Sequence, residues 1–285
     1  MIFWIASYPK SGNTWIRALL SAYYYSKNGV YDEDLLKKID QFPTRKYFLD
    51  FNFDKTKVGD TCQHWISAQK KINTKKELKF FKTHNVFGKV NSYDFTNAEN
   101  SLGCIYIVRD PRNVFTSLKN HYDLDNQEGL KWMKDENKFI YEVEKFKENG
   151  FSDFTFISSW KINYISWKVQ KKIPIKIIRY EDLFQKTFTI SKEIIEFINK
   201  LTNNYKKINI SKLKNAVQTT NFDKLKKKEI NEGFSESVIS NKNKNKKIYF
   251  FNLGPKNDWK KILDKNIKEK IENSFHKELK ELSYK

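Results

Sequence analysis

Three short stretches of this chain place cations, hydroxyl groups and an imidazole where they could bind a phosphate-like anion. The first, ASYPKSGNTWIR, sets Lys10 beside Ser11 and Gly12. We predict that a strand ends here and a helix begins near Asn13, because helix amino termini leave outward-pointing N–H groups unpaired. Gly12 lets a ligand approach the backbone, and Ser11 and Thr14 add hydroxyl donors. Such a turn suits a terminal phosphate or sulfate, but an ordinary turn with an exposed lysine fits the same residues.

The second stretch, YIVRDPRNVFTSLKNHY, places Arg109 where a strand should end and Ser117 about two turns into the next helix. Ligands of open α/β sheets sit beyond the carboxyl ends of the strands. A guanidinium and a hydroxyl at that edge are suited to hold a second phosphate. A surface ion pair between Arg109 and Asp110 would give the same pattern.

The third stretch, FFKTHN, sets Lys82 two residues before His84, again after an expected strand. A neutral imidazole at that position is suited to take a proton from an attacking hydroxyl. Isolated histidines are more often structural, so the proximity of Lys82 is what makes His84 a candidate base.

A sheet must bring these stretches to one edge. Apolar runs predict strands, and apolar residues at helical spacing predict helices. The alternation predicts an α/β fold with a mostly parallel central sheet and helices on both faces, in a single domain covering residues 1–285. The expected strands are 2–7, 79–83, 102–110 and 173–180. Helices are expected from residue 13 and at 32–40, 60–71, 112–122, 129–149, 154–172, 186–204 and 258–284, with a mobile loop at 224–247.

The chain is strongly basic. Its 285 residues include 54 Lys and Arg against 34 Asp and Glu, an excess of 20. This charge indicates an anionic partner, or else a coding bias that places lysine on solvated surfaces. Two cysteines without metal-type spacing, no apolar run long enough for a membrane span and no evident leader predict a cytoplasmic protein.

Together the motifs resemble those of the sulfotransferases that use 3′-phosphoadenosine 5′-phosphosulfate (PAPS), the soluble aryl and alcohol type and its bacterial relatives. The resemblance extends from residue 3 to about residue 284. Its six segments occur in the family's order: YPKSGNTW, FFKTHN, IVRDPRNVFTSLKNHY, SSWKINYISW, RYEDL followed by TTNF, and LGPKNDWKK.

The resemblance implies a P-loop-like phosphosulfate-binding loop and in-line transfer of a sulfuryl group from PAPS to an acceptor hydroxyl or amine. His84 would be the general base, with Lys10 and Lys82 stabilising the leaving oxygen. No metal is implied, and the acceptor would be a small molecule or a glycan. The implied donor-binding residues are Lys10, Ser11, Gly12, Asn13, Thr14, Trp15, Arg109, Ser117, Tyr180, Thr220, Phe222 and Gly254.

The chain departs from the family in two places. The Arg-Lys-Gly of the closing loop is Asn252, Leu253 and Gly254 here, so two cations expected at the 3′-phosphate are missing, and Lys247 or Lys256 is a candidate substitute. A frequent family histidine near Trp160 is replaced by Asn163.

Two other classes of protein, and the nature of the acceptor, stay open at this point. A nucleotide kinase would need G-x-x-x-x-G-K-[ST] and Mg²⁺ ligands, and the motif is missing. A nucleic-acid-binding protein would fit the charge, although its basic residues should cluster with exposed aromatics. The aromatic segment 42–53 is either the lining of an apolar acceptor pocket or plain core. The oligomeric state is not predicted.

Overall fold

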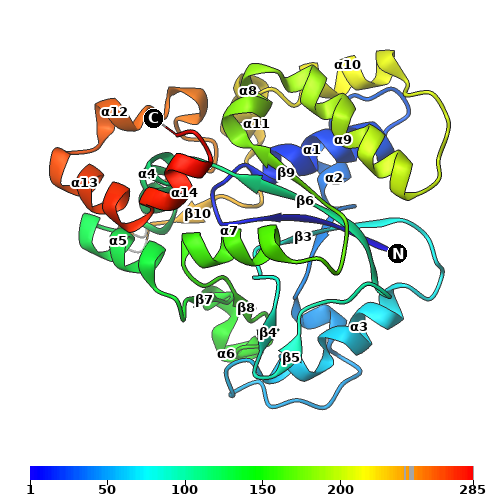
Figure 1. Cartoon of the computed structure of the whole chain (residues 1–285), viewed down its shortest axis with the longest axis horizontal. Coiled ribbons are helices and arrows are strands. Elements are labelled where there is room, and N and C mark those ends of the chain that lie inside the picture. Colours follow the sequence, from blue (N-terminus) through cyan, green and yellow to red (C-terminus); the bar gives the residue numbers. More distant parts are fainter. Residues whose placement is uncertain (241, 244–246, 285) are drawn as a thin grey trace.

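The computed structural model describes residues 1–240, 242–243 and 247–284. Within these residues the main sheet has five strands in the order β2–β3–β1–β6–β9, all paired in parallel (Figure 1). The predicted α/β class and parallel sheet are therefore confirmed. The strands are β1 (Ile2–Ser7), β2 (Asp40–Gln41), β3 (Lys79–Thr83), β6 (Ser101–Val108) and β9 (Ile175–Arg179).

Helices connect these strands, and short antiparallel pairs lie in the connections. The pairs are β4 (Lys89–Val90) with β5 (Tyr93–Asp94), β7 (Phe139–Ile140) with β8 (Thr155–Phe156), and β10 (Val238–Ile239) with β11 (Lys247–Ile248). The α-helices are α1 (Asn13–Tyr25), α2 (Glu33–Leu36), α3 (Trp65–Ile72), α4 (Pro111–Tyr122), α5 (Asn126–Lys134), α6 (Phe146–Asn149), α7 (Trp160–Val169), α8 (Tyr180–Gln185), α9 (Thr187–Leu201), α10 (Ile210–Thr219), α11 (Phe222–Glu232), α12 (Trp259–Ile262), α13 (Lys265–Ser274) and α14 (His276–Glu281). The 3₁₀ turns are η1 (Arg45–Tyr47), η2 (Asp60–His64), η3 (Val143–Lys145) and η4 (Gly254–Lys256).

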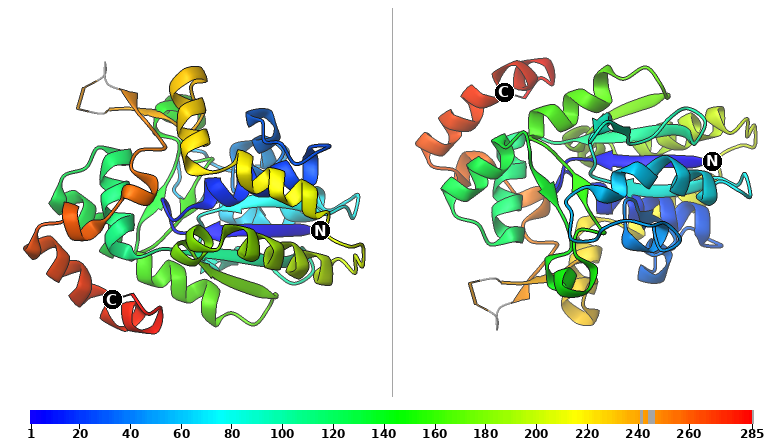
Figure 2. Two further views of the ribbon diagram at one scale, coloured as in Figure 1. Left: turned by 90° about the horizontal axis from the view of Figure 1, so that it is seen from above. Right: turned by 90° about the horizontal axis from the view of Figure 1, so that it is seen from below.

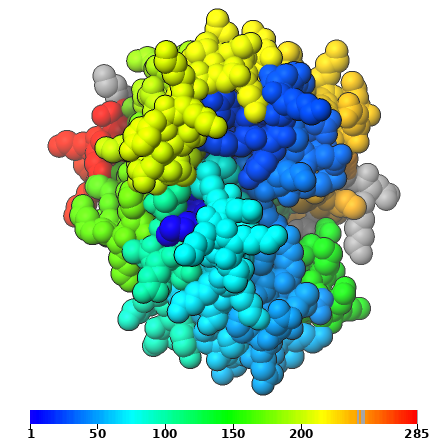
Figure 3. All heavy atoms as spheres, turned by 90° about the vertical axis from the view of Figure 1, so that its right-hand side faces the viewer, coloured from blue at the N-terminus to red at the C-terminus, as the bar shows by residue number. Residues whose placement is uncertain are grey.

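Both faces of the sheet are covered, as the continuous apolar character of its central strands predicts. Successive side chains of a strand point to opposite faces. Phe3 and Ile5 of β1 pack in one core cluster, which includes residues of α1 and α9, whereas Trp4 and Ala6 pack in the other with residues of α3, α4 and α7. Figure 2 shows the two helical layers from above and below. In Figure 3 the yellow, blue and cyan segments surround a small dark-blue patch that belongs to the first residues of the chain.

The parallel register places the functional stretches at one edge. Ala6 of β1 pairs with Thr83 of β3, Ser7 pairs with Ile107 of β6, and Val108 pairs with Arg179 of β9. These strands therefore end at nearly the same level. The residues that follow them open toward the side of the molecule where α4 and α12 lie (Figure 1).

Two expected helices are wrong in extent. The span 129–149 contains the end of α5, strand β7, the η3 turn and α6 instead of one helix. The helix α5 ends at Lys134, because the following residues turn to pair Phe139 with Phe156. The span 154–172 likewise begins with β8, and its helix α7 starts only at Trp160.

The prediction of a mobile loop at 224–247 is wrong for the first third of that span. Residues up to Glu232 form α11, which is capped by the side chain of Asn221 on the backbone N–H of Lys224. Residues 238–239 pair with 247–248, while 241 and 244–246 lie outside the described residues. Among the described residues, no helix is long and apolar enough to cross a membrane.

Candidate active site

A cavity of about 340 Å³ opens at the carboxyl edge of the sheet and collects most of the predicted site residues. Ser11 and Thr220 are the two predicted residues that do not line it: both are fully buried, and Thr220 donates its hydroxyl to the carbonyl of Ala216. The predicted residues that line the cavity are Lys10, Gly12, Asn13, Thr14, Trp15, Lys82, His84, Arg109, Ser117, Tyr180, Phe222 and Gly254.

The turn between β1 and α1 is held in an uncommon backbone conformation. Lys10 has φ 65° and Gly12 has φ 104°, both in the left-handed region that favours glycine. The Asn13 side chain fixes the turn to β1, because its Nδ2 donates to the Ile5 carbonyl at 2.9 Å and to Ser7 Oγ at 3.2 Å. The turn therefore leads directly into the amino terminus of α1, the arrangement expected for anion binding.

The side-chain Nζ of Lys10 is buried at this turn without a hydrogen-bonding partner among the described residues. It lies 3.6 Å from the centroid of the Phe250 ring. Burial lowers the pKa of Lys10 to about 7, and the cations Lys82 and Arg109 contribute to the lowering. An unpaired ammonium inside a cavity is costly unless a ligand supplies the missing acceptors.

His84 has the tautomer that a general base needs. Its Nδ1 lies 2.7 Å from the Ser7 carbonyl oxygen. A carbonyl can only accept, so Nδ1 carries the proton and Nε2 keeps its lone pair. Burial lowers the pKa of His84 to about 3, with a further contribution from Lys82, so the ring is neutral at pH 7.

Helix α7 positions the His84 segment. Asn163 Nδ2 donates to the His84 carbonyl at 2.9 Å and to the Ile157 carbonyl at 2.8 Å, while its Oδ1 accepts from the Tyr106 hydroxyl at 2.8 Å. Trp167 Nε1 donates to the Asn85 carbonyl at 2.9 Å. The departure at Asn163 thus has a structural role, and the SSWKINYISW segment anchors the backbone next to the candidate base.

Replacing Asn163 by Leu should lower the free energy of unfolding by about 3 kcal/mol, since each buried polar group left unpaired costs about 1–3 kcal/mol. Three partners lose their hydrogen bond in this variant. Urea unfolding measures the change, with Asn137→Leu at an exposed position as the matched control. Equal losses in the two variants would contradict the anchoring role.

Arg109 is held in the cavity by a network behind it. Its Nη1 donates to the Lys10 carbonyl at 3.1 Å, its guanidinium lies 4.2 Å from the Tyr180 ring centroid, and its Nε has no partner among the described residues. Asp110 does not pair with Arg109. Its carboxylate instead binds Arg112 at 2.8 Å.

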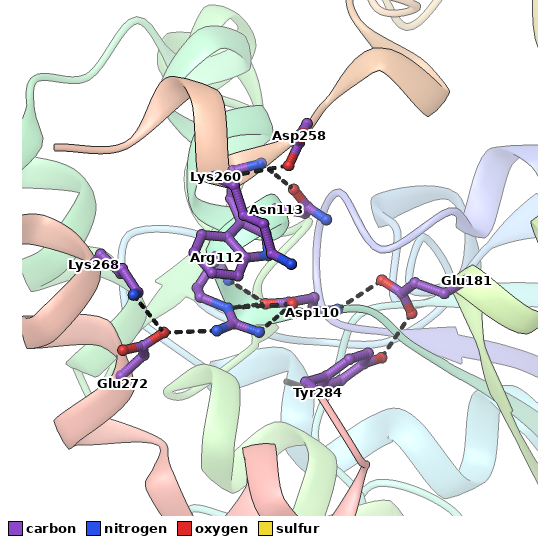
Figure 4. A network of polar contacts seen from close by, with 10 residues as sticks. Asp110, Arg112, Asn113, Glu181, Asp258, Lys260, Lys268, Glu272 and Tyr284 are labelled. Carbon is purple, nitrogen blue, oxygen red and sulfur yellow. Dashed lines mark hydrogen bonds and ion pairs between the residues drawn. The ribbon is translucent and has the colours of Figure 1, made fainter. Parts of the chain in front are cut away.

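The network ties this turn to the C-terminal helices (Figure 4). Arg112 also donates to Glu272 of α13 at 2.7 Å. Glu181 accepts from the Asp110 backbone N–H at 3.1 Å and from the Tyr284 hydroxyl at 2.9 Å. The backbone that follows Arg109 is therefore held by long-range contacts that no local sequence pattern reveals.

Aromatic rings close over two glycines of the cavity. A Cβ on Gly12 would lie 2.6 Å from the Tyr180 ring, and one on Gly254 would lie 2.2 Å from the Phe222 ring. Trp15 packs edge-on to Tyr180 with 5.7 Å between ring centroids, and its Nε1 is buried without a partner in the described part of the chain. Trp15, Tyr180 and Phe222 thus form the aromatic part of the cavity, which suits a flat heterocycle.

Other cavity residues were not predicted from the sequence. His121 and Tyr122 lie at the end of α4, and Phe250 covers Lys10. Glu236 reaches the cavity from the segment after α11 and contacts Thr14 and Lys82. A composition rich in Lys, Asn and Glu conceals Glu236, because the pattern is the same as that of a solvated loop.

The expected replacements for the missing cations do not line this cavity. Asn252 and Leu253 do line it, and so do Thr116 and Asn257, where the Thr116 hydroxyl donates to Asn257 Oδ1. Lys247 borders a neighbouring hollow together with Asn252 and Leu253. An amide and an aliphatic side chain therefore stand in the cavity wall where the family has its Arg-Lys pair.

The aromatic segment 42–53 belongs to the core. Phe42 and Phe48 are fully buried in the cluster on the α7 side of the sheet, and Tyr47, Phe51 and Phe53 pack against it. They do not line the cavity, so the core interpretation is the correct one. Within the described ranges, no group of three or more His, Cys, Asp or Glu side chains is placed to hold a metal ion.

Comparison with known proteins decides the family. A model described as "Sulfotransferase domain" matches residues 2–283. This chain belongs to the sulfotransferase family. The predicted recognition is therefore confirmed, and with it an enzyme of the sulfotransferase class.

Two curated relatives agree with this sulfotransferase assignment. Luciferin sulfotransferase of Photinus pyralis is 25% identical over 229 residues, which cover 78% of this chain and 56% of the relative. The match thus spans little more than half of that protein. Sulfotransferase 1E1 of Mus musculus is 24% identical over 285 residues, covering 99% of this chain and 84% of the relative.

Solved structures confirm the sulfotransferase fold. Mouse sulfotransferase SULT7A1 complexed with PAP has a TM-score of 0.55 and 18% identity, covering 96% of this chain and 82% of that chain. Retinol dehydratase in a complex with retinol and PAP has a TM-score of 0.55 and 16% identity, and the match covers 98% of this chain and 81% of that chain.

Proposed function

We propose that this sulfotransferase transfers a sulfuryl group from PAPS to a hydroxyl or amine of a small-molecule or glycan acceptor, with residues 1–285 acting as one domain. PAP, adenosine 3′,5′-bisphosphate, is what remains of PAPS after transfer, so the liganded relatives support PAPS as the donor. The family match favours this function over the nucleotide kinase that the sequence left open.

One observation carries the proposal: Lys10, Lys82, Arg109 and His84 line a single cavity, and the buried Lys10 ammonium has no hydrogen bond to any described residue. PAPS has an anion at each end of a nucleoside. The β1–α1 turn with Lys10 fits the phosphosulfate, Arg109 and Ser117 fit the 3′-phosphate, and the aromatic residues beside Gly12 fit the adenine.

The chain's own groups suit the chemistry. His84 Nε2, unprotonated because Nδ1 donates to Ser7, takes the proton of the attacking hydroxyl. Lys10, Lys82 and the backbone N–H groups at the start of α1 stabilise the charge that grows on the leaving oxygen. Positioning and charge stabilisation suffice, since the sulfuryl group is already electrophilic.

The acceptor should enter beside His84. The cavity lining also includes Gln41, His121, Tyr122 and Ile140, a mixture of polar, aromatic and aliphatic side chains. Such a lining fits a ring-bearing molecule with additional polar groups.

Labelled PAPS incubated with a panel of phenols, alcohols, amines and sugars tests the proposal. We expect label on at least one acceptor and one PAP released per transfer. Failure to bind PAP, together with no label on any acceptor, would refute it.

Replacing Arg109 by Ala should weaken binding of PAP about ten- to hundredfold, because a charge-assisted hydrogen bond contributes about 1.5–3 kcal/mol. Binding of adenosine 5′-phosphosulfate, which lacks the 3′-phosphate, should change far less. Calorimetric titration of both ligands measures the difference, and Arg45→Ala on the η1 turn outside the cavity is the control. Equal weakening of both ligands would contradict the 3′-phosphate role.

A further inference from the structure

Three side chains converge on the Glu236 carboxylate, and two of them, Thr14 and Lys82, line the cavity together with Glu236. Thr14 Oγ1 donates to Glu236 Oε2 at 2.7 Å, Arg17 Nη1 donates to Glu236 Oε1, and Lys82 Nζ lies 3.4 Å from the same oxygen. Arg17 and Lys82 are largely buried, with side-chain exposures of 8% and 12%. Glu236 comes from a segment more than 150 residues away from each of these partners in the chain.

Thr14 and Lys82 line the phosphosulfate end of the cavity, and Arg17 reaches that end through its contact with Glu236. Thr14 is in the first turn of α1, after the turn that carries Lys10, and Lys82 is two residues before His84. Arg17 lies three residues after Thr14, on the same face of the helix. Its Nη2 donates to the Ile39 carbonyl at 2.9 Å, so the guanidinium is fixed with Nη1 directed at the carboxylate.

The segment that carries Glu236 is attached to α11. Glu229 is buried in α11, and its carboxylate accepts from the backbone N–H of Phe251 at 2.8 Å and also binds Phe250 N and Ser237 Oγ. Through these contacts Glu236 and the Phe250 ring are both placed in the cavity. Glu236 covers the group formed by Thr14, Arg17 and Lys82, and the Phe250 ring covers Lys10.

The charges agree with the geometry. Burial alone would raise the pKa of Glu236, but Lys82 and Arg17 lower it well below its usual range, so the side chain is ionised. A carboxylate resembles one oxyanion face of a phosphate or sulfonate in charge and acceptor geometry.

We propose that Thr14, Arg17 and Lys82 form an oxyanion subsite for the 5′-phosphosulfate end of the donor, and that the Glu236 carboxylate occupies this subsite until the donor displaces it. The proposal rests on the function proposed above and adds two residues to it. Arg17 contacts the donor, and Glu236 competes with it. The free energy of donor binding is then the difference between two interactions with the same three groups, that of the donor anion and that of the Glu236 carboxylate.

Glu236→Gln tests the competition. The variant keeps an oxygen for Thr14 but loses the charge, so PAP should bind about tenfold more tightly, as expected when one charge-assisted contact no longer has to be broken. Adenosine 3′-phosphate, which has no 5′-anion, should bind within about twofold of wild type, because only a 5′-anion meets the competing carboxylate. Glu232→Gln is the matched control, since that carboxylate pairs with Lys228 on the exposed side of α11.

The double variant Arg17→Gln/Glu236→Gln tests whether Arg17 contributes to donor binding. Removing both charges avoids leaving a buried charge unpaired. Relative to Glu236→Gln alone, it should bind PAP about tenfold more weakly and leave adenosine 3′-phosphate unchanged. Circular dichroism and thermal unfolding verify that both variants are folded.

The outcomes separate the two proposals. If wild type binds PAP but Glu236→Gln binds it equally or more weakly, or both ligands change together, the competition is overturned and the proposed function stands. Equal loss of both ligands in the double variant gives Arg17 a structural role only. If neither wild type nor Glu236→Gln binds PAP, the donor assignment itself is wrong.

Discussion

Replacing His84 by Ala should lower the rate of sulfuryl transfer by about 10²–10⁴-fold, which is the usual effect of removing a general base. The ring is neutral because burial, together with Lys82, lowers its pKa to about 3. It presents an unprotonated Nε2 because Nδ1 donates to the Ser7 carbonyl. PAP affinity should change little, since the base acts on the acceptor.

His84→Asn is the sharper variant for this prediction. An amide can still donate to the Ser7 carbonyl and hold the strand end, but it cannot accept a proton. Single-turnover rates and PAP affinity are measured together, with exposed His276→Ala on α14 as the control. A rate near that of wild type for both variants of His84 would show that another group takes the proton.

Replacing Lys10 by Met should lower the transfer rate by about 10²–10³-fold, the typical effect of losing one oxyanion donor. The loss of PAPS affinity should be smaller. Charge on the leaving oxygen grows as its bond to sulfur breaks, so an ammonium at that oxygen stabilises the transition state more than the bound donor. Met keeps much of the side-chain volume beside Phe250. An affinity loss with an unchanged single-turnover rate would make Lys10 a ground-state contact.

Lys10 also provides a thermodynamic signature. Its pKa of about 7 means that most of this side chain is neutral at pH 8 in the empty cavity. A bound anion raises that pKa, so binding PAP at pH 8 should take up close to one proton, roughly the unprotonated fraction. Calorimetry in buffers of different ionisation enthalpy measures the uptake. Lys10→Met should abolish most of it, and exposed Lys38→Met should not.

The sheet and its edge were predictable from local patterns. The apolar runs 2–7 and 79–83 coincide with β1 and β3, and the helix expected from residue 13 is α1. Parallel strands that end at the same level bring Lys10, His84 and Arg109 into one cavity, as expected from their positions after the strands. Short-range periodicity was sufficient because each motif adjoins its own strand.

Long-range pairing was not predictable. Residues 129–149 were expected to form one helix, yet Phe139 pairs with Phe156 in a short antiparallel ladder, and its ring centroid lies 6.1 Å from that of Phe151. Glu229 and Glu236 look like surface residues of a charged segment, but one caps two backbone N–H groups and the other binds Arg17. Arg17 carried one usable signal, its position one turn after Thr14 on the same helix face.

The proposed function requires this cavity to transfer a sulfuryl group from PAPS to an acceptor. The most direct measurement is a single-turnover experiment with labelled PAPS bound to excess enzyme, followed by addition of the acceptor panel. We predict that the label moves to an acceptor in wild type, with one PAP formed per label, and that His84→Asn binds the donor equally well but leaves the label on it. Transfer at the same rate in His84→Asn and wild type, or no PAPS binding by wild type, would contradict the account.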